Sequence, residues 1–219
     1  MGERLFRMSV GLLVVLFTMA PIVIALAPYE STMGLVQKIF YFHVPSWFVM
    51  FSSAFVCGIC SAIYLFRRKG WAGRVALAAC ELTVLFGLIG LVTGPLWARR
   101  AWGVWWQWDA RLTTALILWM VFVAYLLVRR YGGPGSDKLA AVMGMFGMAI
   151  VPFVYWSVNV WRTVHPTTNV VPTLGPGMRG AFWLCSAAFL LLYVVVLVVR
   201  TQLETQRERL EHLYLMFEE

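Results

Sequence analysis

The longest uncharged run of the sequence extends from residue 39 to residue 66 and reads IFYFHVPSWFVMFSSAFVCGICSAIYLF. It contains no Asp, Glu, Lys or Arg, and it is followed at once by Arg67, Arg68 and Lys69. A helix of about 20 apolar residues crosses the ~30 Å hydrocarbon layer of a membrane. This stretch is therefore long enough to span a bilayer, and the cations after it are typical of a span end at the membrane surface.

Five further apolar runs flank this stretch, at residues 8–27, 75–97, 112–128, 139–161 and 181–199. The composition agrees, because 61% of the 219 residues are hydrophobic and only 13% are charged. A soluble domain is about half apolar and a quarter charged. The sequence therefore excludes an ordinary soluble enzyme and a large extramembrane domain. It predicts an all-α, polytopic integral membrane protein with a six-helix transmembrane bundle.

The first run could also be a secretory signal peptide, because Arg4 and Arg7 precede it and Ala25-Leu26-Ala27 ends it. The run is long enough to cross a bilayer, however, and Pro28 would directly follow the cut, which is unfavourable. We therefore expect a retained helix.

The distribution of Lys and Arg predicts the orientation of the bundle. With six spans both termini lie on one side, and the loops at residues 28–38, 98–111 and 162–180 lie on the other. These three loops hold six of the 18 Lys and Arg residues, namely Lys38, Arg99, Arg100, Arg111, Arg162 and Arg179. The more positive side faces the cytoplasm, so we expect both termini to be cytoplasmic. Topology thus explains the net charge of +8 and removes the argument for nucleic acid as a partner.

The loop at residues 98–111, called here the tryptophan-rich segment, carries four of the 11 tryptophans: Trp102, Trp105, Trp106 and Trp108. Tryptophan also forms aromatic belts at membrane surfaces, but a belt needs only one or two aromatic residues at each span end. Four indoles in one loop, together with Gly103, favour a platform for a large planar apolar ligand.

Charged residues flank this platform. Asp109 stands just before the fourth span, where a carboxylate can cap the free N–H groups of a helix. Arg99, Arg100 and Arg111 could serve as interfacial anchors or pair with the carboxylates of a ligand.

Two of the three histidines fall on the same outward side as the platform. His43 lies at the outer start of the second run and His165 lies in the third outward loop, whereas His212 is in the C-terminal segment. A single histidine at the membrane surface is usually only a polar residue at the edge of a span, without a ligand. Two beside an aromatic platform are better explained as a pair of axial ligands for a haem iron. A zinc site would usually need three or four protein ligands, and this side offers no cysteine and no further histidine.

The four cysteines, Cys57, Cys60, Cys80 and Cys185, all lie inside apolar runs. Cys57 and Cys60 have the spacing of a redox or metal pair, but no basic neighbour is present to lower a thiol pKa. Ser61, not His, follows Cys60, so the pair is not a covalent haem attachment site. We expect Cys57 and Cys60 to be small buried residues.

The string WGVWWQWD at residues 102–109 resembles the tryptophan-rich signature of the haem-handling proteins of cytochrome c biogenesis. Its continuation, Ala110-Arg111-Leu112-Thr113, resembles specifically the six-span haem exporter protein C family of the cytochrome c maturation system. The haem lyases of the same superfamily are longer. The resemblance extends over essentially the whole chain, because the number of spans, the place of the motif and the two flanking histidines all agree.

This resemblance implies a function and a location. Haem b would be held transiently and without a covalent bond between His43 and His165, on the periplasmic side of the bacterial cytoplasmic membrane. The platform would comprise Trp102, Gly103, Trp105, Trp106, Trp108, Asp109 and Arg111. The expected partners are a membrane-anchored periplasmic haem chaperone, an ABC-type ATPase with another membrane subunit, and a small single-span protein. The chain has no glycine-rich phosphate-binding loop, so we expect a haem-handling subunit and not an enzyme.

Two other functions compete with haem handling. A membrane b-type electron carrier would generally place its histidine pairs within facing spans. A small transporter would gather polar residues at mid-membrane, where Glu81 is almost alone, and we assign Glu81 no role. Residues 1–200 are expected to form the membrane domain, and residues 201–219 an amphipathic cytoplasmic tail that either lies on the membrane or docks on a cytoplasmic subunit.

Overall fold

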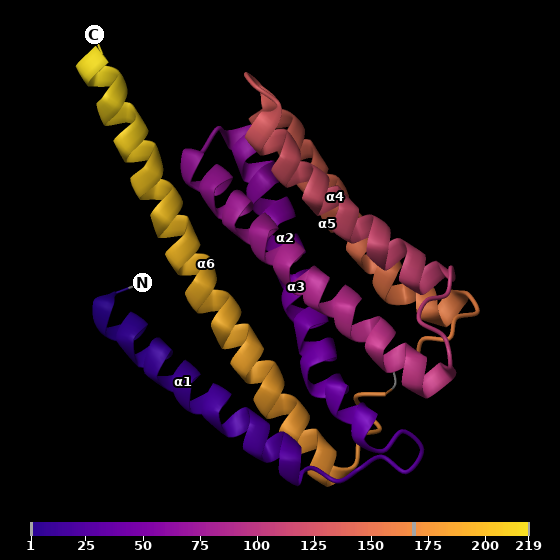
Figure 1. The fold of residues 1–219 in the computed structure, drawn as a ribbon. Coiled ribbons are helices and arrows are strands. Elements are labelled where there is room, and N and C mark those ends of the chain that lie inside the picture. The colour runs from indigo at the N-terminus through magenta and orange to yellow at the C-terminus, as the bar shows by residue number, and fades with distance from the viewer. Residues whose placement is uncertain (1, 168–169, 219) are drawn as a thin grey trace.

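The computed structural model describes residues 2–167 and 170–218, and over these residues it contains six long helices (Figure 1). They are α1 (Glu3–Leu26), α2 (Phe40–Arg67), α3 (Gly70–Trp102), α4 (Ala110–Tyr131), α5 (Ser136–Val160) and α6 (Pro176–Glu218), with a short 3-10 turn, η1 (Leu35–Ile39), before α2. All six are long and apolar enough to cross a membrane. The predicted all-helical architecture with six candidate spans is confirmed.

Helices α2 and α3 form the centre of the bundle (Figure 1). Helices α4 and α5 pack together on one side of this central pair, and α6 lies on the other side with α1 beyond it. The α1–α2, α3–α4 and α5–α6 connections all lie at one end of the bundle, which we call the site end. The three outward loops of the sequence prediction therefore share one end.

Small residues let the central helices approach closely. Ala72, Ala76, Ala79 and Cys80 of α3 are fully or almost fully buried in the main core. All four cysteines of the chain are buried and free, and their burial agrees with the prediction for Cys57 and Cys60. A second apolar cluster lies at the site end, where α1, α2 and α6 meet around Tyr41 and Phe182.

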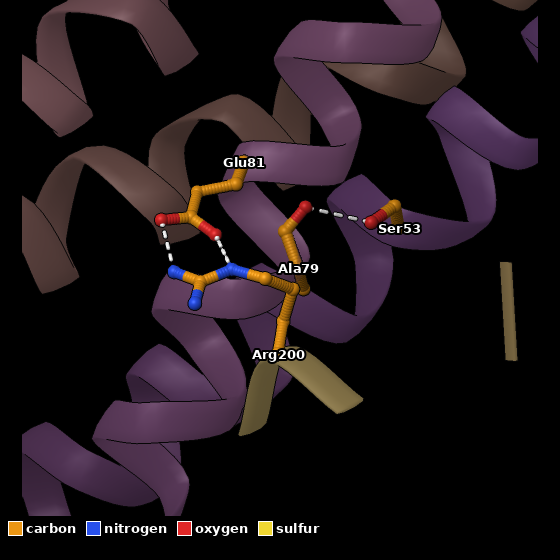
Figure 2. Close-up of polar contacts among 4 residues, drawn as sticks. All are labelled: Ser53, Ala79, Glu81 and Arg200. Atoms are coloured by element: carbon orange, nitrogen blue, oxygen red, sulfur yellow. Dashed lines mark hydrogen bonds and ion pairs between the residues drawn. The ribbon is translucent and has the colours of Figure 1, made fainter. Parts of the chain in front are cut away.

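Two ion pairs join α6 to α3 toward the opposite end, and Figure 2 shows the one between Arg200 and Glu81. Arg200 donates two hydrogen bonds to the carboxylate of Glu81, at 2.6 and 2.7 Å, and Arg74 pairs with Glu208 at 2.7 Å. The Ser53 hydroxyl also donates to the Ala79 carbonyl at 2.7 Å, which joins α2 to α3 (Figure 2). Glu81 thus has a defined partner that the sequence did not indicate.

Two helices, α3 and α6, extend furthest beyond the C-terminal ends of the apolar runs that predicted them. Helix α3 continues to Trp102 and ends at Gly103, whose φ of 78° is a left-handed conformation that suits glycine. Within the tryptophan-rich segment only residues 103–109 are therefore an irregular connection, because α4 begins at Ala110. Helix α6 continues through the predicted tail as one helix of 43 residues, about 64 Å long, and its C-terminal part projects past the bundle (Figure 1).

Candidate functional site

His43 lies in the first turn of α2 and is only 5% exposed. Its Nδ1 is 2.9 Å from the Thr93 hydroxyl on α3. That hydroxyl donates its own proton to the Ile89 carbonyl at 2.7 Å, so it accepts from His43 and the ring proton is on Nδ1. A neutral imidazole with its proton on Nδ1 has a free lone pair on Nε2. The orientation of the His43 ring is therefore fixed by a hydrogen bond on one nitrogen, while the other nitrogen is free.

His165 lies in the α5–α6 connection and shows the same arrangement. Its Nδ1 is 2.8 Å from the Pro166 carbonyl, which can only accept, so Nδ1 carries the proton and Nε2 is free. Burial, and then the positive charge of Arg111, lower the pKa of His165 to about 4. The ring is therefore neutral at pH 7, which is the form that binds metals.

Two adjoining cavities at the site end share both histidines in their walls. The first encloses about 540 Å³ of empty space, part of it open to solvent, and lies toward the tryptophan-rich segment. The second, of about 1100 Å³, lies toward α5 and α6, where Tyr155 and Trp183 contribute to its walls. Trp47, Trp97 and Arg111 also line both cavities. The fold thus brings His43 and His165 to one aromatic site, although they are far apart in sequence.

The four predicted platform tryptophans take different positions. Trp102, Trp105 and Trp106 line the first cavity, whereas Trp108 and Gly103 line neither cavity. Trp108 is 75% exposed and Trp105 57% exposed. Among the described residues the buried indole N–H of Trp106 has no hydrogen-bond partner. A buried donor of this kind normally has a partner, so the first cavity offers an unused polar group.

The three arginines that the sequence singled out also differ in their positions and contacts. Arg111 lines both cavities, donates to the Val154 carbonyl and lies over the Phe51 ring at 5.9 Å. Arg99 donates to the Gly103 carbonyl and lies over Trp105 at 6.0 Å. Arg100 lines neither cavity and is exposed.

Asp109 caps the start of α4, as the sequence predicted, because its Oδ1 accepts from the Leu112 N–H at 2.8 Å. Its Oδ2 accepts from the Thr163 hydroxyl and from the Val164 N–H, the latter at 3.1 Å. The carboxylate thus joins the start of α4 to the α5–α6 connection. Asp109 lines neither cavity.

Sequence reasoning missed three residues of the site. Trp47 lies one turn after His43 on the same face of α2, so the four-residue spacing was an available signal. Thr93 lies between Gly90 and Gly94, a spacing that permits close helix packing. A Cβ atom at Gly90 would lie 2.7 Å from the Trp47 ring. Trp97 gave no signal beyond its position at a span end, where an anchoring tryptophan is ordinary.

Taken together, the fold and the site define a class of protein: a six-helix membrane protein with two oriented imidazoles and an aromatic double cavity at one end of the bundle. Comparison with known proteins identifies the family. Residues 1–215 match the family model described as Heme exporter protein C. The chain belongs to this family.

Individual relatives agree with this assignment. The chain is similar to Heme exporter protein C of Bradyrhizobium diazoefficiens, with 34% identity over 199 residues that cover 88% of this chain and 75% of the relative. The Paracoccus denitrificans protein of the same name is 32% identical over 194 residues, 84% of this chain and 80% of the relative. The protein from Escherichia coli K12 is 29% identical over 181 residues, 80% of this chain and 72% of the relative.

Proposed function

We propose that this protein binds haem b non-covalently at the site end, with His43 and His165 as axial ligands, and passes the haem to a chaperone for the maturation of c-type cytochromes. The observation that carries the proposal is that the two histidines have the same hydrogen-bonding arrangement. Each uses Nδ1 for a hydrogen bond within the protein, and each borders both cavities. Two neutral imidazoles with free Nε2 atoms are the ligands that a six-coordinate haem iron takes.

The surrounding groups fit the rest of the ligand. Haem supplies a flat apolar ring and two carboxylates, and indole faces match the ring. The free N–H of Trp106 and the remaining donors of Arg111 suit the carboxylates, because a guanidinium has five N–H groups. Of the other predicted platform residues, Trp102 and Trp105 line the first cavity together with Trp106, whereas Gly103, Trp108 and Asp109 line neither cavity and would act only through their neighbours.

The family name and the distribution of positive charge support the cellular setting. In this proposal the protein is a multi-pass protein of the bacterial cytoplasmic membrane, with both termini in the cytoplasm and the site end in the periplasm. It works as a transport subunit and not as an enzyme. Its partners are a membrane-anchored haem chaperone, an ABC-type ATPase with its membrane subunit, and a small single-span subunit.

The deciding experiment is the optical spectrum of the purified, haem-loaded protein. His43→Ala and His165→Ala should each convert six-coordinate haem to a five-coordinate form and increase haem loss. His212→Ala is the matched control, because His212 lies on the exposed part of α6 and should leave the spectrum unchanged. Acid–acetone extraction should remove the haem completely. If both cavity variants keep the wild-type spectrum, the axial assignment is wrong.

A second measurement separates the proposed transfer from electron transport by a b-type carrier. Haem should move from the purified protein to the chaperone, whereas reduction and reoxidation by a quinol would support the electron carrier. Trp106→Ala should lower haem retention, and Trp71→Ala is its control because Trp71 is exposed at the start of α3, away from both cavities. If both variants retain haem equally well, the tryptophan-rich segment would be an aromatic belt and not a haem platform.

A further inference from the structure

The carboxylate of Asp109 lies where the start of α4 meets the α5–α6 connection. We propose that Asp109 is a positioning residue, which holds His165 in place through Thr163 and does not contact the ligand. This inference rests on the proposed function, because His165 is the group that it positions. It also gives the acidic residue of the WGVWWQWD string a physical task that differs from that of the tryptophans.

The contacts form one connected network around His165. The His165 N–H donates to the Thr163 hydroxyl at 3.0 Å, and the Thr163 hydroxyl donates its own proton to Asp109 Oδ2. The Val164 N–H donates to the same oxygen at 3.1 Å. Thr163 and Val164 are thus bonded directly to a single carboxylate oxygen, and His165 is joined to it through the Thr163 hydroxyl.

The other oxygen of Asp109 attaches this network to a rigid element. Oδ1 accepts from the Leu112 N–H at 2.8 Å, and the Asp109 carbonyl accepts from the Thr113 N–H at 3.0 Å. Asp109 is therefore fixed to the first turn of α4, which also carries Arg111. The same carboxylate sets the position of His165 relative to Arg111, and both of these residues line both cavities.

The chemistry suits a positioning task. Hydrogen bonds to an ionised carboxylate are roughly twice as strong as those between neutral groups. An irregular connection gains most from such attachments, because it has no helical hydrogen bonds of its own to hold a side chain in place. Removing an outer partner of a metal ligand typically lowers affinity by about 10- to 100-fold.

Asp109→Asn separates the two tasks of the carboxylate. Asparagine is as good a helix cap as aspartate, so α4 should keep its start, but the amide NH₂ is no acceptor for Thr163 and Val164. We expect haem affinity to fall by about 10- to 100-fold, with part of the bound haem becoming five-coordinate and the melting temperature almost unchanged. Thr163→Val should act in the same direction, and Thr163→Ser should restore the wild-type spectrum.

The double variant tests whether the two residues act through one interaction. If they do, Asp109→Asn combined with Thr163→Val should lower affinity by less than the product of the two single effects. Fully multiplicative effects would mean that Asp109 contacts the ligand independently, and would overturn the proposal.

Amide hydrogen exchange in the haem-free protein tests the network without any ligand. Exchange of the Val164 and His165 amides should be at least about tenfold faster in Asp109→Asn than in wild type, because their acceptors are lost or loosened. Unchanged exchange would overturn the positioning role. If His165→Ala left the haem spectrum unchanged, the proposed function would fail instead, and the exchange result would still decide whether Asp109 orders this connection.

Discussion

The hydroxyl of Thr93 determines which nitrogen of His43 is free. It accepts from Nδ1 at 2.9 Å while its own proton is committed to the Ile89 carbonyl. Thr93→Val keeps the shape of the side chain but leaves a buried imidazole donor without a partner, which costs roughly 1–3 kcal/mol. We expect haem affinity to fall about 10- to 100-fold, measured by titration with haem. Thr93→Ser should stay close to wild type, and equal affinity in the valine variant would show that Thr93 does not orient the ring.

The two histidines could be predicted from the sequence, whereas their hydrogen-bond partners could not. His43 and His165 stood out because the chain has only three histidines and because two of them fell on the side of the tryptophan-rich segment. The Thr93–His43 bond joins residues 50 positions apart. Which threonine faces which ring depends on how α2 and α3 rotate about their axes, and hydropathy does not encode that rotation.

At the scale of elements, Gly90 controls how closely α3 approaches α2. A Cβ atom there would lie 2.7 Å from two atoms of the Trp47 ring. Gly90→Ala should therefore destabilise the protein by about 1–3 kcal/mol through overpacking and should weaken haem binding, because Trp47 lines both cavities. Gly11→Ala on α1 is the control: nothing lies within 4 Å of its Cβ position, so thermal unfolding in detergent should show no loss.

The Glu81–Arg200 pair tests how α6 is attached to α3 (Figure 2). Both side chains are about one-third exposed, at 33% and 32%, so solvent screening limits the gain. A double-mutant cycle with Glu81→Gln and Arg200→Gln should give a coupling energy near 1 kcal/mol in thermal unfolding. The Arg207–Glu211 pair is the control, since it is more exposed and lies within one helix turn, and we expect at most about 0.5 kcal/mol there. Equal couplings would mean that the α3–α6 pair adds nothing to the packing.

The existence of the elements was predictable, but their ends were less so. Six uncharged or nearly uncharged runs sufficed to predict six helices. The run ending at Trp97 stopped short of the true helix end, because Arg99 and Arg100 are compatible with a helix and only Gly103 terminates it. The tail likewise continued α6, since nothing between Arg200 and Glu218 breaks a helix. Hydropathy identifies the part of a helix that lies in lipid, whereas capping residues decide where it stops.

At the scale of the whole molecule, the antiparallel order of the helices brings the segments of the site together at one end of the bundle. Because α1–α2, α3–α4 and α5–α6 connect at the same end (Figure 1), the segments that carry His43, the four tryptophans and His165 must meet there. The sequence predicted this meeting from the number of spans alone. It did not predict that Trp108 would line neither cavity and remain exposed, because hydropathy does not encode how the chain turns between Gly103 and the helix cap at Asp109.

The orientation of this assembly in the membrane rests on the charge count and is open to a direct test. Gln107 and Lys69 are exposed at opposite ends of the bundle, and the four native cysteines are buried and should react little. Gln107→Cys should therefore react in intact cells with a maleimide that crosses the outer membrane but not the cytoplasmic membrane. Lys69→Cys should react only after the cytoplasmic membrane is permeabilised. The reverse pattern would place the haem site on the cytoplasmic side, and delivery to a periplasmic chaperone would then be excluded for this site. Labelling of both positions in detergent is the control that each cysteine is reactive when it is reached.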